Sequence, residues 1–219
     1  MNPFRRYRRW EKDEFVLCYA DTSWGGEDYS AAQFLSKDNI DVPLVYHQKG
    51  LASDMTPLLH QELENIFDIT GIKPVVSYER NNGGVAELER LRALNRLQKY
   101  RIYTQYSNIG TTGSIETADN AKYGHDTNAA TRPVMLAALK DAIDNKLIKL
   151  YDQLTVDEMF SFIVKQTASG GWKAQAETGS HDDLIMSLAG VWQLYLTEHK
   201  PTVIKHRQNH KQARARFHV

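Results

Sequence analysis

Phe15-Val-Leu-Cys-Tyr-Ala20 is a continuously apolar stretch rich in strand-forming residues, and the turn-rich sequence Asp21-Thr-Ser-Trp-Gly-Gly26 follows it directly. A short apolar run bounded by turn residues is typical of a strand with both faces buried. Asp21 stands at the end of this run. We therefore expect a central strand that carries a carboxylate where it ends.

The rest of the chain predicts two more strands and then an alternation of strands and helices. The two strands follow the first through short polar connections, which indicates an antiparallel meander. Periodic apolar residues mark the later elements. In chain order, the elements predicted after the first strand are strands at about 29–36 and 42–49, a helix around 58–67, a strand at 75–78, a helix around 88–97, a strand at 101–106, a loop with room for a hairpin at 107–128, a helix at 132–145, an edge strand at 147–151, a short helix at 156–163, a hairpin around 169–172 and a helix at 181–199.

This order of elements indicates an α/β fold with a mixed central sheet and helices on both faces. A length of 219 residues suits one domain with a substantial core. We expect that domain to span residues 13–200, with a basic segment at 1–12 and a basic tail at 201–219.

Charge is distributed unevenly along a chain that is formally neutral. Residues 1–10 hold four arginines and no acid, and residues 205–219 hold five lysines or arginines and no acid, so 18 basic and 27 acidic side chains lie between them. An acidic body suits cation binding, and basic ends suit a polyanion such as DNA. Both ends can equally be solvated termini.

The single cysteine, Cys18, excludes an internal disulfide and a zinc site built from several cysteines. No apolar run approaches the length of a membrane span. The N-terminal arginines lead into charged residues 11–14 and not into the apolar core of a signal peptide. We expect a cytoplasmic protein with no membrane partner.

Acids end or open several of the predicted elements. Asp21 and Glu79 each end a strand, and Asp182 and Asp183 open the last helix. A carboxylate at the end of a buried strand is costly unless it is paired, hydrogen-bonded or bound to a metal. Asp21 could instead bond the turn that follows it, and Glu79 could form a surface ion pair with Arg80 or a neighbouring lysine.

The Ser180-His-Asp-Asp183 sequence also has a purely structural explanation. Ser180 can cap the helix, with Asp183 at the third helical position completing a capping box. A helical projection places Asp182 on the margin of the buried stripe, so we expect Asp182 to point towards the sheet and Asp183 to point further outward. Both remain candidate metal ligands from the first turn.

Carboxylates gathered in this way are the ligands that hard divalent cations prefer. Phosphodiester hydrolysis needs an activated water, a stabilised leaving oxygen and compensation of charge on the phosphorus. Two Mg²⁺ or Mn²⁺ ions roughly 3.5 to 4 Å apart supply all three. Asp21, Glu79, Asp182 and Asp183 therefore predict a nuclease that uses two divalent cations.

Four segments of the sequence resemble the nuclease domain of tailed-bacteriophage terminase large subunits. Three of them carry the acids, and the fourth resembles the family's segment before the penultimate helix. The resemblance extends from about Arg9 to Tyr195 in the family's order. The segments are Tyr19-Ala-Asp-Thr-Ser-Trp-Gly-Gly-Glu-Asp-Tyr29, Glu79-Arg-Asn-Asn-Gly83, Tyr123-Gly-His-Asp-Thr-Asn-Ala-Ala-Thr-Arg-Pro-Val-Met-Leu136 and Gly179-Ser-His-Asp-Asp-Leu-Ile-Met-Ser-Leu-Ala189.

The resemblance implies a ribonuclease H-like fold and an endonuclease that cuts concatemeric double-stranded viral DNA when packaging starts and when the head is full. Asp21, Glu79 and Asp182 or Asp183 would match the family's metal ligands. The implied partners are double-stranded DNA, the terminase ATPase domain, the small terminase subunit and the portal, in the cytoplasm of a bacterial host.

Other polar residues are candidates for supporting roles. Asp28 matches an acid often seen after the family's first turn, and it can equally be a plain loop acid. His181 can contact the scissile phosphate or simply occupy the first helical position. Lys173 can reach DNA from the predicted hairpin or be solvated. The remaining DNA-binding candidates are in the basic tail: Lys205, Arg207, Lys211, Arg214 and Arg216.

The sequence departs from the family in one respect, because it contains no Gly-x-x-x-x-Gly-Lys-Ser/Thr phosphate loop. We expect the ATPase motor to be absent from this chain, which is either an excised domain or a separately encoded nuclease half, and residues 1–12 to be the remnant of an interdomain linker. Two other interpretations stay open. The fold also serves junction resolvases and transposases, and a non-catalytic packaging module could dock on the portal or small subunit and hold DNA.

Overall fold

In the computed structural model of the protein, residues 2–81, 83–106, 121–166, 172–176 and 181–201 are described, with the backbone alone at 24, 26, 27, 106, 121, 162–166 and 172–176. The central sheet contains β1 (Phe4–Arg6), β2 (Val16–Asp21), β3 (Trp24–Ser36), β4 (Asp41–Leu51), β5 (Val75–Tyr78), β6 (Arg101–Ile102) and β9 (Lys149–Leu150). The strand order is β1-β4-β3-β2-β5-β6, and β9 pairs with β4.

Strand β2 lies between an antiparallel and a parallel neighbour. It pairs antiparallel with β3 and parallel with β5, and all six of its residues are buried. Strands β2, β3 and β4 form the expected antiparallel meander. The sheet is therefore mixed, as the order of elements predicts.

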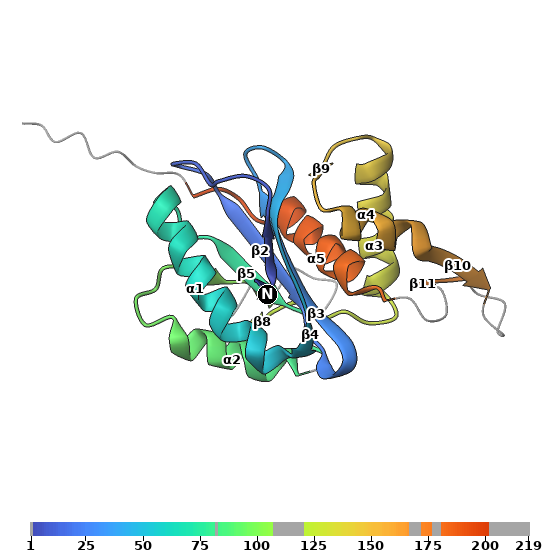
Figure 1. Ribbon diagram of the computed structural model, residues 1–219, viewed down its shortest axis with the longest axis horizontal. Helices are drawn as coiled ribbons and strands as arrows, with labels where there is room; N and C mark the ends of the chain where they lie inside the picture. The colour runs from blue at the N-terminus through green and yellow to red at the C-terminus, as the bar shows by residue number, and fades with distance from the viewer. Residues whose placement is uncertain (1, 82, 107–120, 167–171, 177–180, 202–219) are drawn as a thin grey trace, which may run out of the picture.

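Helices cover both faces of this sheet (Figure 1). On one side lie α1 (Ala52–Thr70) and α2 (Gly84–Leu94), and on the other lie α3 (Thr131–Asp144), α4 (Gln153–Ser161) and α5 (Asp183–Thr197). Two separate groups of buried residues fill the spaces between the sheet and these layers. The predicted α/β fold is confirmed.

Alternation along β2 explains why its sequence is continuously apolar. Leu17 and Tyr19 contribute to the core beneath α3 and α5. Val16, Cys18 and Ala20 contribute to the core beneath α1 and α2. Since side chains alternate between the two faces of a strand, a strand covered on both faces has no solvent side on which polar residues would be favoured.

Two predicted elements are shorter in the structure than the sequence indicates, because the chain passes into a new element before the predicted end. The strand expected at 101–106 is divided into β6, which pairs with β5, and β7 (Thr104–Tyr106), which pairs with β8 (Ala121–Tyr123). The short helix expected at 156–163 ends earlier, and β10 (Phe162–Gln166) follows it immediately. β10 and β11 (Trp172–Ala176) form the expected hairpin, which projects away from the central sheet (Figure 1).

The arginine-rich start of the chain is part of the folded domain. β1 pairs antiparallel with β4, and Trp10 is buried in the core beneath α1. Arg8 bridges Glu14 and Asp41. The assignment of residues 1–12 to an interdomain linker stays a prediction, but the described part of this segment contributes a strand to the sheet.

The described helices include none that is long and apolar enough to cross a membrane. Of the predicted C-terminal tail, only residue 201 is described.

Helix α5 approaches the sheet closely at Gly190. A Cβ added at that position would lie 2.3 Å from the Tyr19 ring, well inside van der Waals contact. Tyr19 is fully buried in the middle of the sheet and cannot retreat without moving its neighbours. Gly190 thus lets α5 lie directly against β2.

A buried carboxylate, Asp152, joins β1 to α4. Its side chain accepts hydrogen bonds from Arg5, from the hydroxyl of Tyr7, and from both the backbone N–H and the hydroxyl of Thr155. The contact with the N–H of Thr155 makes Asp152 the N-cap of α4. Burial alone would raise the pKa of Asp152, but Arg5, Tyr7 and Thr155 together lower it to about 2.

We predict that this carboxylate stabilises the fold in a pH-dependent way. Because its pKa is lower in the folded chain than the ordinary value of 3.8, the stabilisation is complete above about pH 4 and is lost as the pH falls through about 2. Asp152→Asn should lower the free energy of unfolding by about 2 kcal/mol at neutral pH. Urea unfolding of both proteins from pH 7 to pH 2 measures this, and a difference that fails to narrow in acid would contradict it.

Candidate active site

The pairing of β2 with β5 places Asp21 and Glu79 side by side. The parallel register runs from Leu17 opposite Val75 to Ala20 opposite Tyr78, and the N–H of Glu79 donates to the carbonyl of Ala20 at 2.9 Å. Leu17, Tyr19 and Val75 face the core beneath α5. Because side chains alternate along each strand, Asp21 and Glu79 point to the same side, towards the N-terminal end of α5.

The two carboxyl groups are in contact and mostly shielded from solvent. Asp21 is 7% exposed and Glu79 is 8% exposed. Burial, the charge of Glu79 and a hydrogen bond shared with Glu79 raise the pKa of Asp21 well above its usual range, and Asp183 and Asp182 raise it further. The pair therefore resists holding two negative charges unless a cation compensates them.

Glu79 is held in place by the turn that follows it. The side-chain amide of Asn81 donates to a Glu79 carboxylate oxygen at 3.0 Å and to the carbonyl of Thr127 at 2.5 Å. Gly84, at the start of α2, lies so close that a Cβ there would be 1.7 Å from the carbonyl oxygen of Glu79. Asn81 thus fixes the carboxylate of Glu79, and Gly84 allows the close approach of its backbone.

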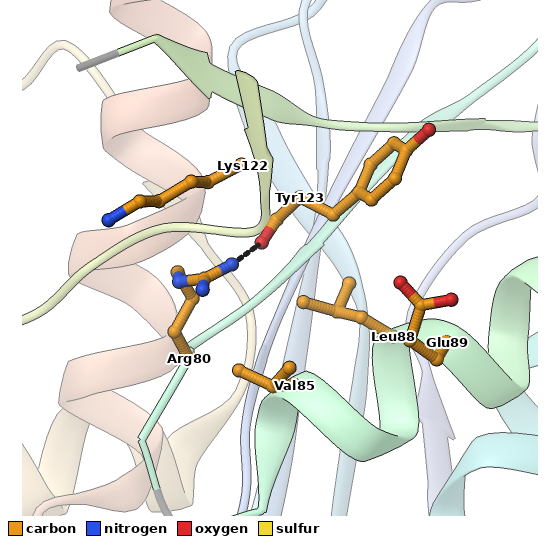
Figure 2. Close-up of a pocket in the computed structure, with 6 residues that line it drawn as sticks. All are labelled: Arg80, Val85, Leu88, Glu89, Lys122 and Tyr123. Carbon is orange, nitrogen blue, oxygen red and sulfur yellow. Dashed lines mark hydrogen bonds between the residues drawn. The ribbon is translucent and has the colours of Figure 1, made fainter. Parts of the chain in front are cut away.

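The alternative that Glu79 serves as a surface partner of Arg80 is not what the structure shows. Arg80 pairs with Asp126 at 2.7 Å and also donates to the carbonyl of Tyr123. Figure 2 shows Arg80 at a separate pocket of about 220 Å³, and the predicted metal ligands do not line it. The pocket residues are Arg80, Val85, Leu88, Glu89, Lys122 and Tyr123.

The acids at the head of α5 are oriented opposite to the sequence prediction. The side chain of Asp183 is 19% exposed, whereas that of Asp182 is 31% exposed and pairs with Arg132 at 2.5 Å. The helix begins at Asp183, and Asp182 precedes it with φ −132° and ψ 15°. A helical projection does not apply to a residue outside the helix, so the expectation that Asp182 points inward was wrong.

Asp183 belongs to the electrostatic environment of the strand acids. Burial, together with the charges of Asp182 and Asp28, raises its pKa to about 6 against the opposing effect of His181. Asp183 in turn acts on Asp21 more strongly than Asp182 does. Asp183 is therefore the member of the pair that faces the strand acids.

The predicted capping box is not formed as proposed. Asp182, and not Ser180, occupies the N-cap position, and it makes no side-chain capping bond. Ser180 lies outside the described residues. A hydrogen-bond acceptor for the first turn of α5 comes from another helix: a carboxylate oxygen of Glu158 on α4 accepts a hydrogen bond from the N–H of Ile185 at 2.9 Å.

Glu158 is a site residue that the sequence reasoning missed. Burial, together with the charges of Asp183 and Asp182, raises its pKa to about 8 against the opposing effect of the N–H groups of Ile185 and Leu184. The sequence gives only a weak signal for it, an acid in a predicted short helix beside the more exposed Asp157. Its contact with α5 depends on tertiary packing.

His181 lies two residues before the helix and not at its first position. The edge of its ring meets Tyr29 at 5.0 Å between centroids, and its Nδ1 lies 3.8 Å from Asp183. Tyr29 also stacks on His47 at 4.5 Å. Asp28 is exposed on β3, near enough for its charge to act on Asp183.

The structure brings some of the predicted site residues together and leaves others untested. Asp21 and Glu79 are in contact, with Asp183 and Asp182 in electrostatic range, but among the described residues no three acidic, histidine or cysteine side chains are grouped closely enough to form a metal site as they stand. Lys173 lies in β11, where only the backbone is described. The tail residues Lys205, Arg207, Lys211, Arg214 and Arg216 lie outside the described residues.

The acid arrangement predicts an effect on stability that does not depend on catalysis. Because the pKa of Asp21 is raised in the folded chain, its ionisation destabilises the fold as the pH rises above the ordinary value of 3.8. Asp21→Asn should therefore raise the midpoint of thermal unfolding in EDTA by about 2–4 °C at pH 7, equivalent to about 1 kcal/mol. The exposed change Asp68→Asn serves as the control, and a lower midpoint for Asp21→Asn than for wild type would contradict the prediction.

Comparison with known proteins identifies similar folds. No protein-family model matches the sequence, and no curated protein matches it. Among solved structures, the large terminase nuclease domain of Thermus phage P74-26 has a TM-score of 0.63 and 17% identity over 92% of this chain and 90% of that one. The large terminase nuclease of thermophilic phage G20c has a TM-score of 0.64 and 19% sequence identity, and the match covers 89% of this chain and 90% of that one. The structure of that nuclease with bound magnesium has a TM-score of 0.63 and 16% sequence identity, and the match covers 88% of each chain. The shared fold confirms the ribonuclease H-like fold class.

Proposed function

We propose that this chain is a metal-dependent endonuclease that cuts concatemeric double-stranded viral DNA during genome packaging. The observation that carries the proposal is the contact of two buried carboxylates, Asp21 and Glu79, beneath the acid pair that opens α5. The fold shared with phage terminase nucleases and the four resembling sequence segments support it.

Asp21, Glu79, Asp183 and Asp182 would hold two Mg²⁺ or Mn²⁺ ions. The donors are all carboxylates, which suits hard divalent cations, and the raised pKa of Asp21 indicates a need for positive charge at this position. One structural neighbour is described with bound magnesium. Such ions would make an attacking water more acidic and stabilise the charge that develops on the phosphate.

Other residues of the chain would prepare this arrangement. Asn81 orients the carboxylate of Glu79 through its bond to Thr127. Arg132 neutralises Asp182, which limits the repulsion between the adjacent acids. Asp28 and His181 would have supporting roles beside Asp183.

The substrate and partners follow from the resemblance. Double-stranded DNA would be held by Lys173 and by the basic tail, and the ATPase motor, small terminase subunit and portal would be the protein partners, in the cytoplasm of a bacterial host. The sequence contains no phosphate-loop motif. ATP hydrolysis would therefore be the task of a motor outside this sequence, whether joined to it or encoded separately.

A nicking assay tests the proposed chemistry. Supercoiled plasmid should be nicked and linearised in Mn²⁺ but not in EDTA, and Asp21→Ala should reduce the rate by about 100-fold or more, because even residues around metal ligands contribute 10- to 100-fold. Circular dichroism should show Asp21→Ala to be folded, and Asp68→Ala is the matched control.

Full activity in Asp21→Ala would exclude the metal proposal. A non-catalytic packaging module gives no nicks in either condition, and a resolvase would prefer branched DNA.

A second experiment concerns the basic tail. Deletion of residues 205–219 removes five lysines or arginines. For duplex DNA, the slope of log affinity against log salt should become shallower by about 0.9 for every phosphate that the tail neutralises. DNA binding measured by fluorescence anisotropy should therefore weaken more at low salt than at high salt. An unchanged slope would mean that the tail does not bind DNA.

A further inference from the structure

Helix α5 begins without a cap of its own. The first four N–H groups of a helix lack partners within the helix and need acceptors from elsewhere. Asp182 at the N-cap position makes no side-chain capping bond. The acceptor for Ile185 is Glu158, which lies 27 residues earlier in the chain on α4.

A buried polar side chain from the sheet joins the same two helices. Gln33 on β3 donates to the hydroxyl of Thr155 on α4 at 3.0 Å and to the carbonyl of Leu184 on α5 at 3.3 Å. Gln33 is fully buried, and Thr155 is almost fully buried. The start of α5 is therefore held by α4 and β3 as well as by the packing of its apolar face.

The start of α4 is held in turn by the N-terminal strand. Asp152 caps α4 through Thr155, and Arg5 and Tyr7 bind the same carboxylate. One end of α4 is thus fixed to β1, and the other end supplies Glu158 to α5. This places α4 as a rigid spacer between the edge of the sheet and the candidate active site.

We propose that Glu158 is a positioning residue that holds the first turn of α5, and with it Asp183 and Asp182, in place for metal binding. Ile185 is only two residues from Asp183, so the bond to Glu158 fixes the backbone that carries this acid. The proposal rests on the proposed nuclease function. It assigns Glu158 no contact with the metal or with DNA.

Three substitutions separate positioning from other roles. Glu158→Gln retains a side-chain oxygen that can accept the hydrogen bond from the Ile185 N–H. Glu158→Ala removes this oxygen, and Glu158→Asp shortens the side chain by one methylene and so moves the oxygen away from Ile185. The control is Asp157→Ala, because Asp157 lies on the same helix and its carboxylate accepts a hydrogen bond from the exposed Gln153, one turn earlier, and not from α5. All four variants are first checked by circular dichroism and thermal unfolding.

The first readout is amide hydrogen exchange in the segment that contains Ile185, which requires neither metal nor DNA. Exchange of the Ile185 amide should be about fivefold faster or more in Glu158→Ala and Glu158→Asp, because its hydrogen-bond acceptor is gone or withdrawn. It should be close to wild type in Glu158→Gln and Asp157→Ala. Unchanged exchange in both Glu158→Ala and Glu158→Asp would overturn the proposed contact.

The second readout is the Mn²⁺ concentration that gives half-maximal plasmid nicking. Glu158→Ala should raise it by about 10-fold or more, with near-normal activity at saturating Mn²⁺, and Glu158→Gln should restore the wild-type value. A glutamine variant as impaired as the alanine variant would show that the charge matters and would overturn a positioning role. If wild type itself gives no Mn²⁺-dependent nicking, the nuclease proposal fails, while the exchange data still decide the contact.

Discussion

The contact between the carboxyl groups of Asp21 and Glu79 is the constraint on which the candidate site depends. Two neighbouring parallel strands present these acids on one face, where burial and the charge of Glu79 disfavour the ionised form of Asp21. A folded domain retains such an arrangement only if the rest of the structure is stable enough to offset its unfavourable free energy. The surrounding features either fix these acids, as Asn81 does, or bring further acids towards them, as α5 does.

The scaffold around the acids is correspondingly rigid. The central strand is covered by two cores, and Gly190 lets α5 lie directly on the ring of Tyr19. Cation affinity and stability of the metal-free fold thus oppose each other at Asp21, since the same negative charges that would attract a divalent ion destabilise the protein without one. Arg132 reduces this conflict only for Asp182, the more exposed acid of the α5 pair.

Sequence reasoning succeeded where a local pattern determines the structure. The apolar run before Asp21 and the strand before Glu79 could be identified because strand periodicity and burial are visible in the sequence. The orientation of Asp182 could not, because it depends on where α5 begins, and the first turn of α5 is in contact with Glu158, which lies far from it in the sequence. Glu158 was missed for the same reason: the partner of a helix end can come from any part of the chain.

The attachment of the N-terminal strand has a mechanical consequence. A force applied to the backbone ahead of Phe4 would act on the hydrogen bonds between β1 and β4 and on the salt bridge between Arg5 and Asp152. Since Asp152 caps α4, whose other end holds Ile185 through Glu158, part of the load would reach the residues that precede Leu184. Tension applied to the chain ahead of Phe4 would thereby have a direct route to the spacing of the acids.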